Sequence, residues 1–371
     1  MRRPAALRPE SATVWANLGV ALFVKKDYDG AVTAYQRATE LAPEDAIAHS
    51  NLGHAWFRKN QLDKAVAAFR TATVLDPTFA TAHSNWGATL SAKKQYREAL
   101  EACRRAVDLD PASAAAHSNL GAVWYAHGEY DKAVAAHRQA IDIDPTFAAA
   151  YANLGSALSA KKDDRAAIAA YRKAIDLDPS SALAHSNLGV VLARVERDDE
   201  AIVSFRRAIA LDPKCANAHA GLGGVLGDKG QHDEAIASCR TALALDAENV
   251  HAHYSLGCAL QEKGEMGKAI AAYREAVRFD PTHAQALNNI AVIYVDQRKY
   301  REAIADARSA IKADPTFSNA HAVLGVSLQQ IGDISGARAA LTEAVRLDKR
   351  WSPQLAALPP VAVAPPPREV R

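Results

Sequence analysis

Apolar residues between positions 46 and 79 follow two helical stripes that are separated by a polar break. The first stripe, at about 100° per residue, contains Ala48, Leu52, Gly53 and Trp56. After Asn60-Gln61, the second stripe contains Ala65, Val66, Phe69, Ala72 and Leu75. Asp76-Pro77 ends it, because proline cannot continue a helix and disfavours helical geometry in the residue before it. The pattern predicts a helix–turn–helix over residues 46–79.

This 34-residue unit recurs along almost the whole chain. Proline marks the end of the unit at Pro9, Pro43, Pro77, Pro111, Pro145, Pro179, Pro213, Pro281 and Pro315. Glycine recurs at its eighth position at Gly19, Gly53, Gly87, Gly121, Gly155, Gly189, Gly223, Gly257 and Gly325, and Ala291 fills the one gap. Ten units therefore run over residues 12–351. Neither helix of a unit can bury its stripe alone, so the units are expected to stack.

Small residues recur where the helices are expected to pack most closely. Alanine occupies positions 20 and 27 of every unit, for example at Ala65 and Ala72. Glycine inside a helix costs about 1 kcal/mol relative to alanine. Its recurrence at position 8 therefore predicts a backbone-to-backbone contact that leaves no room for a side chain.

These positions resemble those of the tetratricopeptide repeat (TPR) family. In the first unit the family pattern is met by Trp15, Leu18, Gly19, Leu22, Ala31, Tyr35, Ala38 and Pro43. The resemblance implies an all-α, right-handed superhelical solenoid of ten TPR repeats, in which the first helix of each repeat lines a concave groove. Histidine replaces the family's aromatic residue at position 4 in His49, His83, His117, His185, His219, His253 and His321. We interpret these histidines as packing residues with a satisfied ring nitrogen.

The residues outside the ten repeats are assigned to an incomplete unit and a cap. Residues 1–11 resemble the tail of an earlier repeat and are assigned as a partial repeat or leader. The uncapped N-terminal end is expected to allow self-association. Residues 352–371 are assigned as a short capping turn and a proline-rich disordered tail. In the turn, Ser352 is predicted to be the helix N-cap, and Leu355 and Leu358 to cover the last apolar face.

Polar residues of the first helix recur on the face opposite its packed stripe. Asparagine occupies position 6 in seven repeats, and we name this set the asparagine ladder: Asn17, Asn51, Asn85, Asn119, Asn153, Asn187 and Asn289. Serine occupies position 5 at Ser50, Ser84, Ser118 and Ser186, and aromatic rings occupy position 12 at Phe23, Phe57 and Tyr125. An amide both donates and accepts, so regularly spaced amides match the C=O and N–H groups of an extended peptide. We predict that these residues bind one.

The ladder is similar to that of the O-linked N-acetylglucosamine transferase repeats, which contact the backbone of the substrate peptide. The similarity implies a non-enzymatic protein–protein interaction scaffold. It does not extend to Gly221, Ser255 and Val323, which occupy position 6 in three later repeats. Two alternatives stay open. The asparagines either set the spacing of the repeats, or belong to the substrate-docking arm of a separate or truncated glycosyltransferase or Ser/Thr kinase.

Composition and motifs narrow the remaining classes of function. The 371 residues include 44 basic and 42 acidic ones, so the net charge of +2 favours neither nucleic acid nor a membrane as partner. The four cysteines form no C-x-x-C pair, and a cytoplasmic location is expected. No phosphate loop, nucleophile elbow or H-E-x-x-H motif occurs. We therefore predict no catalytic residue, no metal ion and no cofactor.

Three further patterns lie outside the ladder. Arginine at position 25, interpreted as a solvated face, occurs at Arg70, Arg104, Arg138, Arg172, Arg206, Arg240, Arg274 and Arg308. His251 and Cys258 share one helical face, but two ligands do not make a metal site. Asp228, Glu262 and Asp296, all at position 13, are expected to make the later part of the groove acidic.

Overall fold

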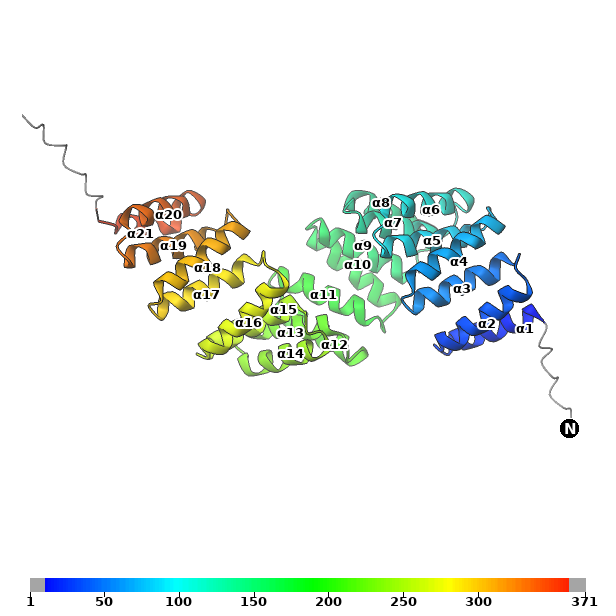
Figure 1. The fold of residues 1–371 in the computed structure, drawn as a ribbon, viewed down its shortest axis with the longest axis horizontal. Helices are drawn as coiled ribbons and strands as arrows, with labels where there is room; N and C mark the ends of the chain where they lie inside the picture. The colour runs from blue at the N-terminus through cyan, green and yellow to red at the C-terminus, as the bar shows by residue number, and fades with distance from the viewer. Residues whose placement is uncertain (1–10, 360–371) are drawn as a thin grey trace, which may run out of the picture. The chain divides into compact units, whose positions relative to one another are not determined.

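The computed structural model describes residues 11–359, which are helical throughout and contain no strand (Figure 1). The first helices of the ten repeats are α1 (Ala12–Val24), α3 (Ala46–Arg58), α5 (Ala80–Ala92), α7 (Ala114–Ala126), α9 (Ala148–Ala160), α11 (Ala182–Arg194), α13 (Ala216–Asp228), α15 (Val250–Glu262), α17 (Ala284–Asp296) and α19 (Ser318–Gln330). The second helices are α2 (Tyr28–Leu41), α4 (Leu62–Leu75), α6 (Tyr96–Leu109), α8 (Tyr130–Ile143), α10 (Asp164–Leu177), α12 (Asp198–Leu211), α14 (His232–Leu245), α16 (Met266–Phe279), α18 (Tyr300–Ala313) and α20 (Ile334–Leu347). The predicted all-α fold of ten helix pairs is confirmed.

The chain divides into two compact units after Val191, inside α11. In the N-terminal unit each second helix from α2 to α8 contacts the first helix of the next repeat, and α1, α3, α5, α7 and α9 also touch in succession. In the C-terminal unit α12, α14, α16 and α18 each contact the following first helix, and α13 touches α15. Equivalent positions of these neighbouring first helices therefore lie next to one another.

The alanines at positions 20 and 27 lie in the core of every repeat, and those at position 27 also pack in clusters with alanines of the next repeat, as Ala242 does with Ala252. All twenty are buried, with at most 2% of their surface exposed. Ala65 and Ala72 of α4, for example, have no exposed surface. A larger side chain at either position would displace the helices around it, so the close packing that the small residues predicted is confirmed.

In eight repeats the glycine at position 8 lies against the side chain at position 24 of its own repeat. A β-carbon at Gly53 would lie 2.9 Å from the ring of Phe69. Where position 24 is a smaller cysteine, as for Gly87 and Cys103, the β-carbon would also lie 2.9 Å from the backbone oxygen of Ala99. The predicted backbone-to-backbone contact is therefore wrong for the aromatic repeats, because the ring fills the space between the helices.

One repeat replaces both members of this glycine–ring pair. Ala291 stands at position 8 and Ala307 at position 24, and neither has any exposed surface. The missing ring leaves room for the extra methyl group at Ala291. The two positions therefore share one volume, which each repeat fills from one side or the other.

The turn inside every repeat ends the first helix in left-handed backbone geometry. The residue at position 15 has a positive φ in all ten repeats: Lys26, Asn60, Lys94, Gly128, Lys162, Glu196, Gly230, Gly264, Arg298 and Gly332. This conformation stops a helix and reverses the chain, and it is easiest for glycine. The turn thus has one geometry although its sequence varies.

The turn between repeats is held by its aspartate. The Asp76 carboxylate accepts hydrogen bonds from the Thr78 amide (2.9 Å) and the Thr78 hydroxyl (2.7 Å). The hydroxyl bond, with the amide bond, lowers the pKa of Asp76. The same pair of bonds forms at Asp144, Asp178, Asp280 and Asp314. Asp-Pro-Thr or Asp-Pro-Ser is therefore a complete turn signal within one repeat.

The last repeat is covered by the 3-10 helix Lys349–Trp351 and by α21 (Ser352–Ala356). Leu358 is buried in the cluster around Leu341, and Leu355 packs against the same cluster. Ser352 does not act as the expected N-cap, because its hydroxyl donates to the Lys349 carbonyl oxygen (2.7 Å). The predicted tail from residue 360 and most of the predicted partial repeat 1–11 lie outside the described residues.

Candidate functional site

The seven histidines at position 4 bind the backbone of the preceding inter-repeat turn. His49 Nε2 lies 3.0 Å from the carbonyl oxygen of Pro43, six residues earlier. The same contact, at 3.0–3.3 Å, is made by His83, His117, His185, His219, His253 and His321. Each ring therefore fixes the turn that joins its helix to the repeat before it, in keeping with the predicted packing role.

Six ladder asparagines lie in the N-terminal unit, at the same position of its six first helices. Asn17, in the first repeat, is exposed. The other five, half-buried, are Asn51, Asn85, Asn119, Asn153 and Asn187. A half-buried amide keeps part of its surface available while its neighbours restrict its rotation.

The serines at position 5 are buried between repeats. Their exposed fractions are 2–5%, for Ser50, Ser84, Ser118 and Ser186. Asn119 Nδ2 donates to Ser84 Oγ (2.9 Å), and Asn153 Nδ2 donates to Ser118 Oγ (3.4 Å). The expectation that the serines face the groove is therefore wrong. A wheel drawn for one helix does not show that the next repeat covers position 5.

Asn289 occupies a different environment, in the C-terminal unit. It is half-buried, and its Nδ2 donates to the Tyr273 hydroxyl at 3.3 Å. That hydroxyl in turn donates to Gln261 Oε1 (2.9 Å). The amide of Asn289 thus belongs to a network of side chains, whereas Asn119 and Asn153 pair with serine.

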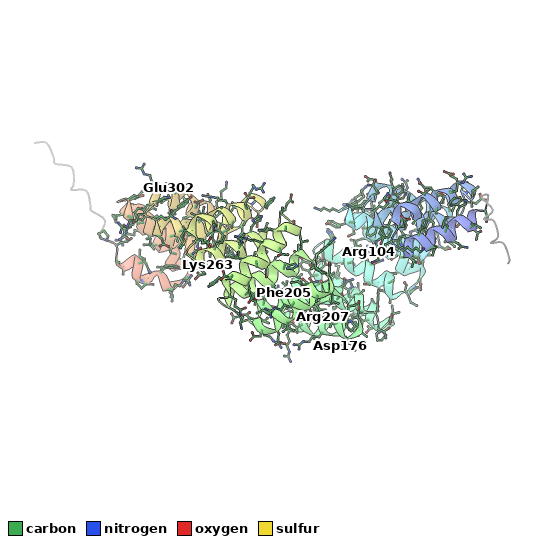
Figure 2. All side chains as sticks on the ribbon, turned by 90° about the horizontal axis from the view of Figure 1, so that it is seen from below. Arg104, Asp176, Phe205, Arg207, Lys263 and Glu302 are labelled. Atoms are coloured by element: carbon green, nitrogen blue, oxygen red, sulfur yellow. The ribbon has the colours of Figure 1, made fainter. Side chains whose placement is uncertain are left out.

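Gly221, which interrupts the asparagine ladder, lies against an aromatic ring of the preceding repeat. A β-carbon at Gly221 would overlap the ring of Phe205, which is buried in the preceding repeat and is labelled in Figure 2. Phe205 occupies position 24, where the family places an aromatic ring. With the Phe205 ring in this position, no side chain fits at 221, whereas Phe69, at the equivalent position of an earlier repeat, is followed by Asn85.

The predicted groove aromatics differ in how much of the ring is accessible. Phe23 is half-buried and packs against Tyr28 and His54, with ring centroids 5.3 and 4.8 Å apart. Phe57 is also half-buried, whereas Tyr125 is 40% exposed. Tyr125 therefore offers the most accessible ring surface of the three.

A cavity of about 580 Å³ opens between α13 and α15 of the C-terminal unit. Its lining includes Gly224, Gly227, Asp228, Tyr254, Cys258 and Glu262. These residues occupy positions 5, 9, 12 and 13 of the two first helices, which the sequence placed on the groove face. His251, expected to share a face with Cys258, also lines the cavity, whereas Asp296 does not.

The polar groups of this cavity are perturbed by burial. Burial and the nearby Asp198 carboxylate raise the pKa of Asp228. Burial also raises the pKa of the Cys258 thiol, whose sulfur lies 3.4 Å from the Tyr273 hydroxyl oxygen. Burial raises the pKa of Tyr254. At neutral pH the thiol and the phenol are therefore uncharged, and the acidic side chains of the lining are Asp228 and Glu262.

Adjacent repeats are also joined by lysine–aspartate pairs that the sequence analysis missed. Lys93 Nζ lies 2.5 Å from Asp63 Oδ1, and Lys229 Nζ lies 2.6 Å from Asp199 Oδ1. Equivalent pairs are Lys59–Asp29, Lys161–Asp131 and Lys263–Asp233. The carboxylates are 83–89% exposed, so each pair stabilises the fold only slightly. A constant 30-residue separation of lysine from aspartate is the sequence signal of these pairs.

Arg274, one of the position-25 arginines that were interpreted as a solvated face, instead pairs with a buried carboxylate. Both terminal nitrogens of Arg274 donate to the carboxylate of Asp306, at 2.7 and 2.8 Å. The Asp306 side chain is only 8% exposed, whereas that of Arg274 is 44% exposed. The carboxylate of Asp306 is therefore buried with this guanidinium as its partner.

We expect Arg274→Ala to lower the free energy of unfolding by about 1–2 kcal/mol, because it leaves a buried carboxylate without its partner. Asp306→Ala should cost less, since alanine occupies the same position in other repeats and Arg274 can turn into solvent. Urea denaturation followed by circular dichroism measures both. Arg308→Ala, at an exposed residue of the same stripe, is the control. Equal losses for Arg274→Ala and Arg308→Ala would contradict the assignment.

Three further features of residues 11–359 concern metal binding, membrane crossing and cysteine pairing. Among residues 11–359, no group of three or more His, Cys, Asp or Glu side chains is placed to hold a metal ion. Over the same range, none of the helices combines the length and the apolarity that crossing a bilayer requires. The four cysteines are all unpaired thiols.

Helix pairs that stack within each unit, with repeating polar positions on their first helices, define a helical-repeat protein. The family model described as a tetratricopeptide repeat matches residues 2–45, 25–78, 189–249, 220–284 and 288–350. A second model, described as a TPR repeat, matches residues 89–128, 123–162 and 157–195. The chain belongs to the tetratricopeptide repeat family. No curated protein sequence matches it significantly.

One solved structure supports the fold, and two others match about half of the chain. The Cut9–Hcn1 hetero-tetramer of APC/C includes a chain that superposes with a TM-score of 0.60 over 93% of this chain and 88% of its own length, at 14% identity. That likeness concerns the fold alone. YrrB, described as a TPR protein with an unusual peptide-binding site, matches 51% of this chain and 97% of its own length, at 24% identity and a TM-score of 0.42. MamA matches 47% of this chain and 94% of its own length, at 29% identity and a TM-score of 0.38.

Proposed function

We propose that this chain is a non-enzymatic protein-interaction scaffold whose N-terminal unit holds an extended peptide segment along its asparagine ladder. Membership of the tetratricopeptide repeat family supports the scaffold role. The four free cysteines suit a reducing, cytoplasmic setting, which we propose as its location. The groove of the O-linked N-acetylglucosamine transferases is the resemblance on which the ladder interpretation rests.

The observation that carries the proposal is the direction of the asparagine–serine bonds. Asn119 and Asn153 donate through Nδ2 to a serine of the preceding repeat. Each amide is thereby held in one orientation, and its Oδ1 is left to accept. An acceptor repeated at equivalent positions matches the N–H groups of an extended peptide backbone, whatever the side chains of that peptide are.

The same bonds are compatible with the alternative hypothesis that the asparagines set the spacing of the repeats. Ser84 and Ser118 link the amide of one repeat to the helix of the previous repeat. The link orders the asparagine before any peptide arrives, so less conformational entropy is lost on binding. Spacing and peptide binding are therefore compatible functions of the same side chain.

The test compares two labelled peptides that differ only in the methylation of their backbone nitrogens. The unmethylated probe is a fluorescein-labelled peptide of about 16 alternating Thr and Ser residues, a sequence that favours an extended chain. Replacing the six ladder asparagines of the N-terminal unit by alanine should weaken its binding more than tenfold, since each lost hydrogen bond costs about 0.5–1.5 kcal/mol. An N-methylated probe, which lacks donors, should bind the unaltered chain equally weakly. Fluorescence anisotropy measures both.

The controls separate binding from folding. Circular dichroism should show unchanged helical content in the asparagine variants, because these residues are exposed or half-buried. Asn289→Ala, outside the N-terminal unit, is the matched control and should leave probe binding unchanged. Equal binding of the methylated and unmethylated probes would refute the proposal. So would unchanged binding after all six substitutions.

A further inference from the structure

The cavity between α13 and α15 coincides with an interruption of the ladder. Position 6 is Gly221 in α13 and Ser255 in α15, and Ser255 lines the cavity. Where the ladder stops, the structure thus opens a space of about 580 Å³, which is within the range of sites for small ligands. The asparagine ladder is suited to a peptide backbone, whereas the cavity between α13 and α15 is suited to a side chain.

Two glycines create the space. Gly224 and Gly227 stand at positions 9 and 12 of α13, where a side chain would project over the cavity. A β-carbon at Gly227 would have only Ala235 Cβ within 4 Å, at 3.9 Å. Phe23 and Phe57 occupy position 12 in the first two repeats. Neither packing nor backbone geometry at Gly227 requires glycine, so its effect is to leave the cavity empty.

Asp228 and Glu262 give the cavity its charge, and no neighbouring lysine neutralises them. Lys229 is held by Asp199, and Lys263 is held by Asp233. Each aspartate is supplied by the second helix of the preceding repeat. Both lysines are therefore paired with aspartates other than Asp228 and Glu262. The Asp198 carboxylate adds negative potential near Asp228, and His251, whose pKa is lowered by burial, is its other titratable neighbour.

The aromatic wall of the cavity is rigid. The Tyr254 ring contacts the rings of Tyr273 and His283, with centroid distances of 5.8 and 4.7 Å. The Tyr273 hydroxyl is fixed by its bond to Gln261. A rigid tyrosine ring beside carboxylates is the combination that binds ammonium and guanidinium groups, through cation–π attraction and charge-assisted hydrogen bonds.

We propose that this cavity binds one cationic side chain, arginine or lysine, of a partner protein. The site is in the C-terminal unit and does not depend on the asparagine ladder. Asp228 and Glu262 pair with the cation, Tyr254 packs against its stem or its planar head, and the glycines of α13 leave the room for it. The chain then selects partners by one basic residue, in addition to any backbone recognition.

The rate at which the Cys258 thiol reacts with a labelling reagent can be used to measure occupancy of the cavity in the full-length chain, because a bound side chain would shield the thiol. It lines the cavity and is half-buried, and Cys215, also half-buried, is not part of the lining. The probes are short peptides, acetyl-Gly-Ser-Xaa-Ser-Gly-amide, in which Xaa is arginine, lysine or the neutral isostere citrulline. The measurement is the rate of N-ethylmaleimide labelling at each thiol, followed by peptide mass spectrometry.

The arginine and lysine probes should slow labelling of Cys258 about fivefold at four times their dissociation constant, and leave Cys215 unchanged. The citrulline probe should not protect. Asp228→Asn with Glu262→Gln should abolish protection, whereas Glu248→Gln, an exposed carboxylate of the same repeat, should not. Gly227→Phe should slow Cys258 labelling without any probe and remove the further effect of the arginine probe.

Three results would overturn the proposal. Equal protection by the citrulline probe would show that binding does not depend on the positive charge of the side chain. Equal protection of Cys215 would show that binding is not located in the cavity. Absence of protection at any probe concentration would show that the cavity does not accept the side chain. The Asn and Gln variants keep nearly the same shape, so this test stands even where Gly227→Phe fails to fold.

Discussion

Gly53→Val is expected to lower the free energy of unfolding by about 3 kcal/mol, as overpacking of a filled core does. Even a β-carbon at Gly53 would lie 2.9 Å from the Phe69 ring, and Phe69 is 1% exposed, so the ring has no space to move into. The valine therefore pushes α3 and α4 apart. Urea denaturation followed by circular dichroism measures the loss.

Two further variants test the cause. Gly267→Val, at a helical glycine with open space around it, should change stability by less than about 0.5 kcal/mol. In a Phe69→Ala background the additional cost of Gly53→Val should fall below about 1 kcal/mol, because the space of the ring is then free. Ala291 and Ala307 are the natural counterpart of that double variant. An undiminished cost in the Phe69→Ala background would show that the ring is not the obstacle.

Acid is expected to destabilise the repeat that contains His137 by up to about 3 kcal/mol between pH 6.5 and 4. His137 is 1% exposed, and burial lowers its pKa to about 4. Its Nδ1 is buried and finds no hydrogen-bond partner among the described residues. Between pH 6.5 and 4 the imidazole of His137 is protonated in the unfolded chain but remains neutral in the folded chain. Stability is therefore complete above pH 6.5 and is lost as the pH falls through 4.

His137→Phe separates this effect from other titrations. Phenylalanine fills position 24 in other repeats, as at Phe69 and Phe205, and cannot be protonated. The difference in unfolding midpoint between pH 7.5 and pH 4.5 should therefore be smaller in the variant than in the unaltered chain. Aspartates such as Asp76, whose pKa is lowered, add their effect below their ordinary range in both proteins. An equal pH dependence of the two proteins would contradict the role of His137.

Much of the fold could be read from single repeats. The helix pairs and their ends at Asp-Pro were predicted because they depend on the pattern within one 34-residue unit. The buried alanines were predicted because they recur at the same two positions of every unit. The partner of the position-8 glycine was predicted wrongly. The joint change at Ala291 and Ala307 was the available sequence signal, since both positions change in the same repeat.

The candidate sites could be predicted only in part. Helical periodicity brought positions 9, 12 and 13 of α13 and α15 to one face, and the structure places several of them around the cavity. The serines of position 5 were assigned to the same face, and the structure buries them. Whether a position at the margin of a helical face is open or covered depends on how the next repeat lies against it, and no single helix contains that information.

The sequence by itself determined the repeat, its two helices, its turns and its family, because the local hydrogen bonds and apolar periods that specify them recur in every unit. Only the tertiary structure decided which equivalent side chains of adjacent repeats meet. It paired Asn119 with Ser84, placed Phe205 where a ladder residue would otherwise stand, and left Gly227 beside an open cavity. Contacts between repeats depend on the distance and angle of stacking, which result from the packing of all the buried side chains together.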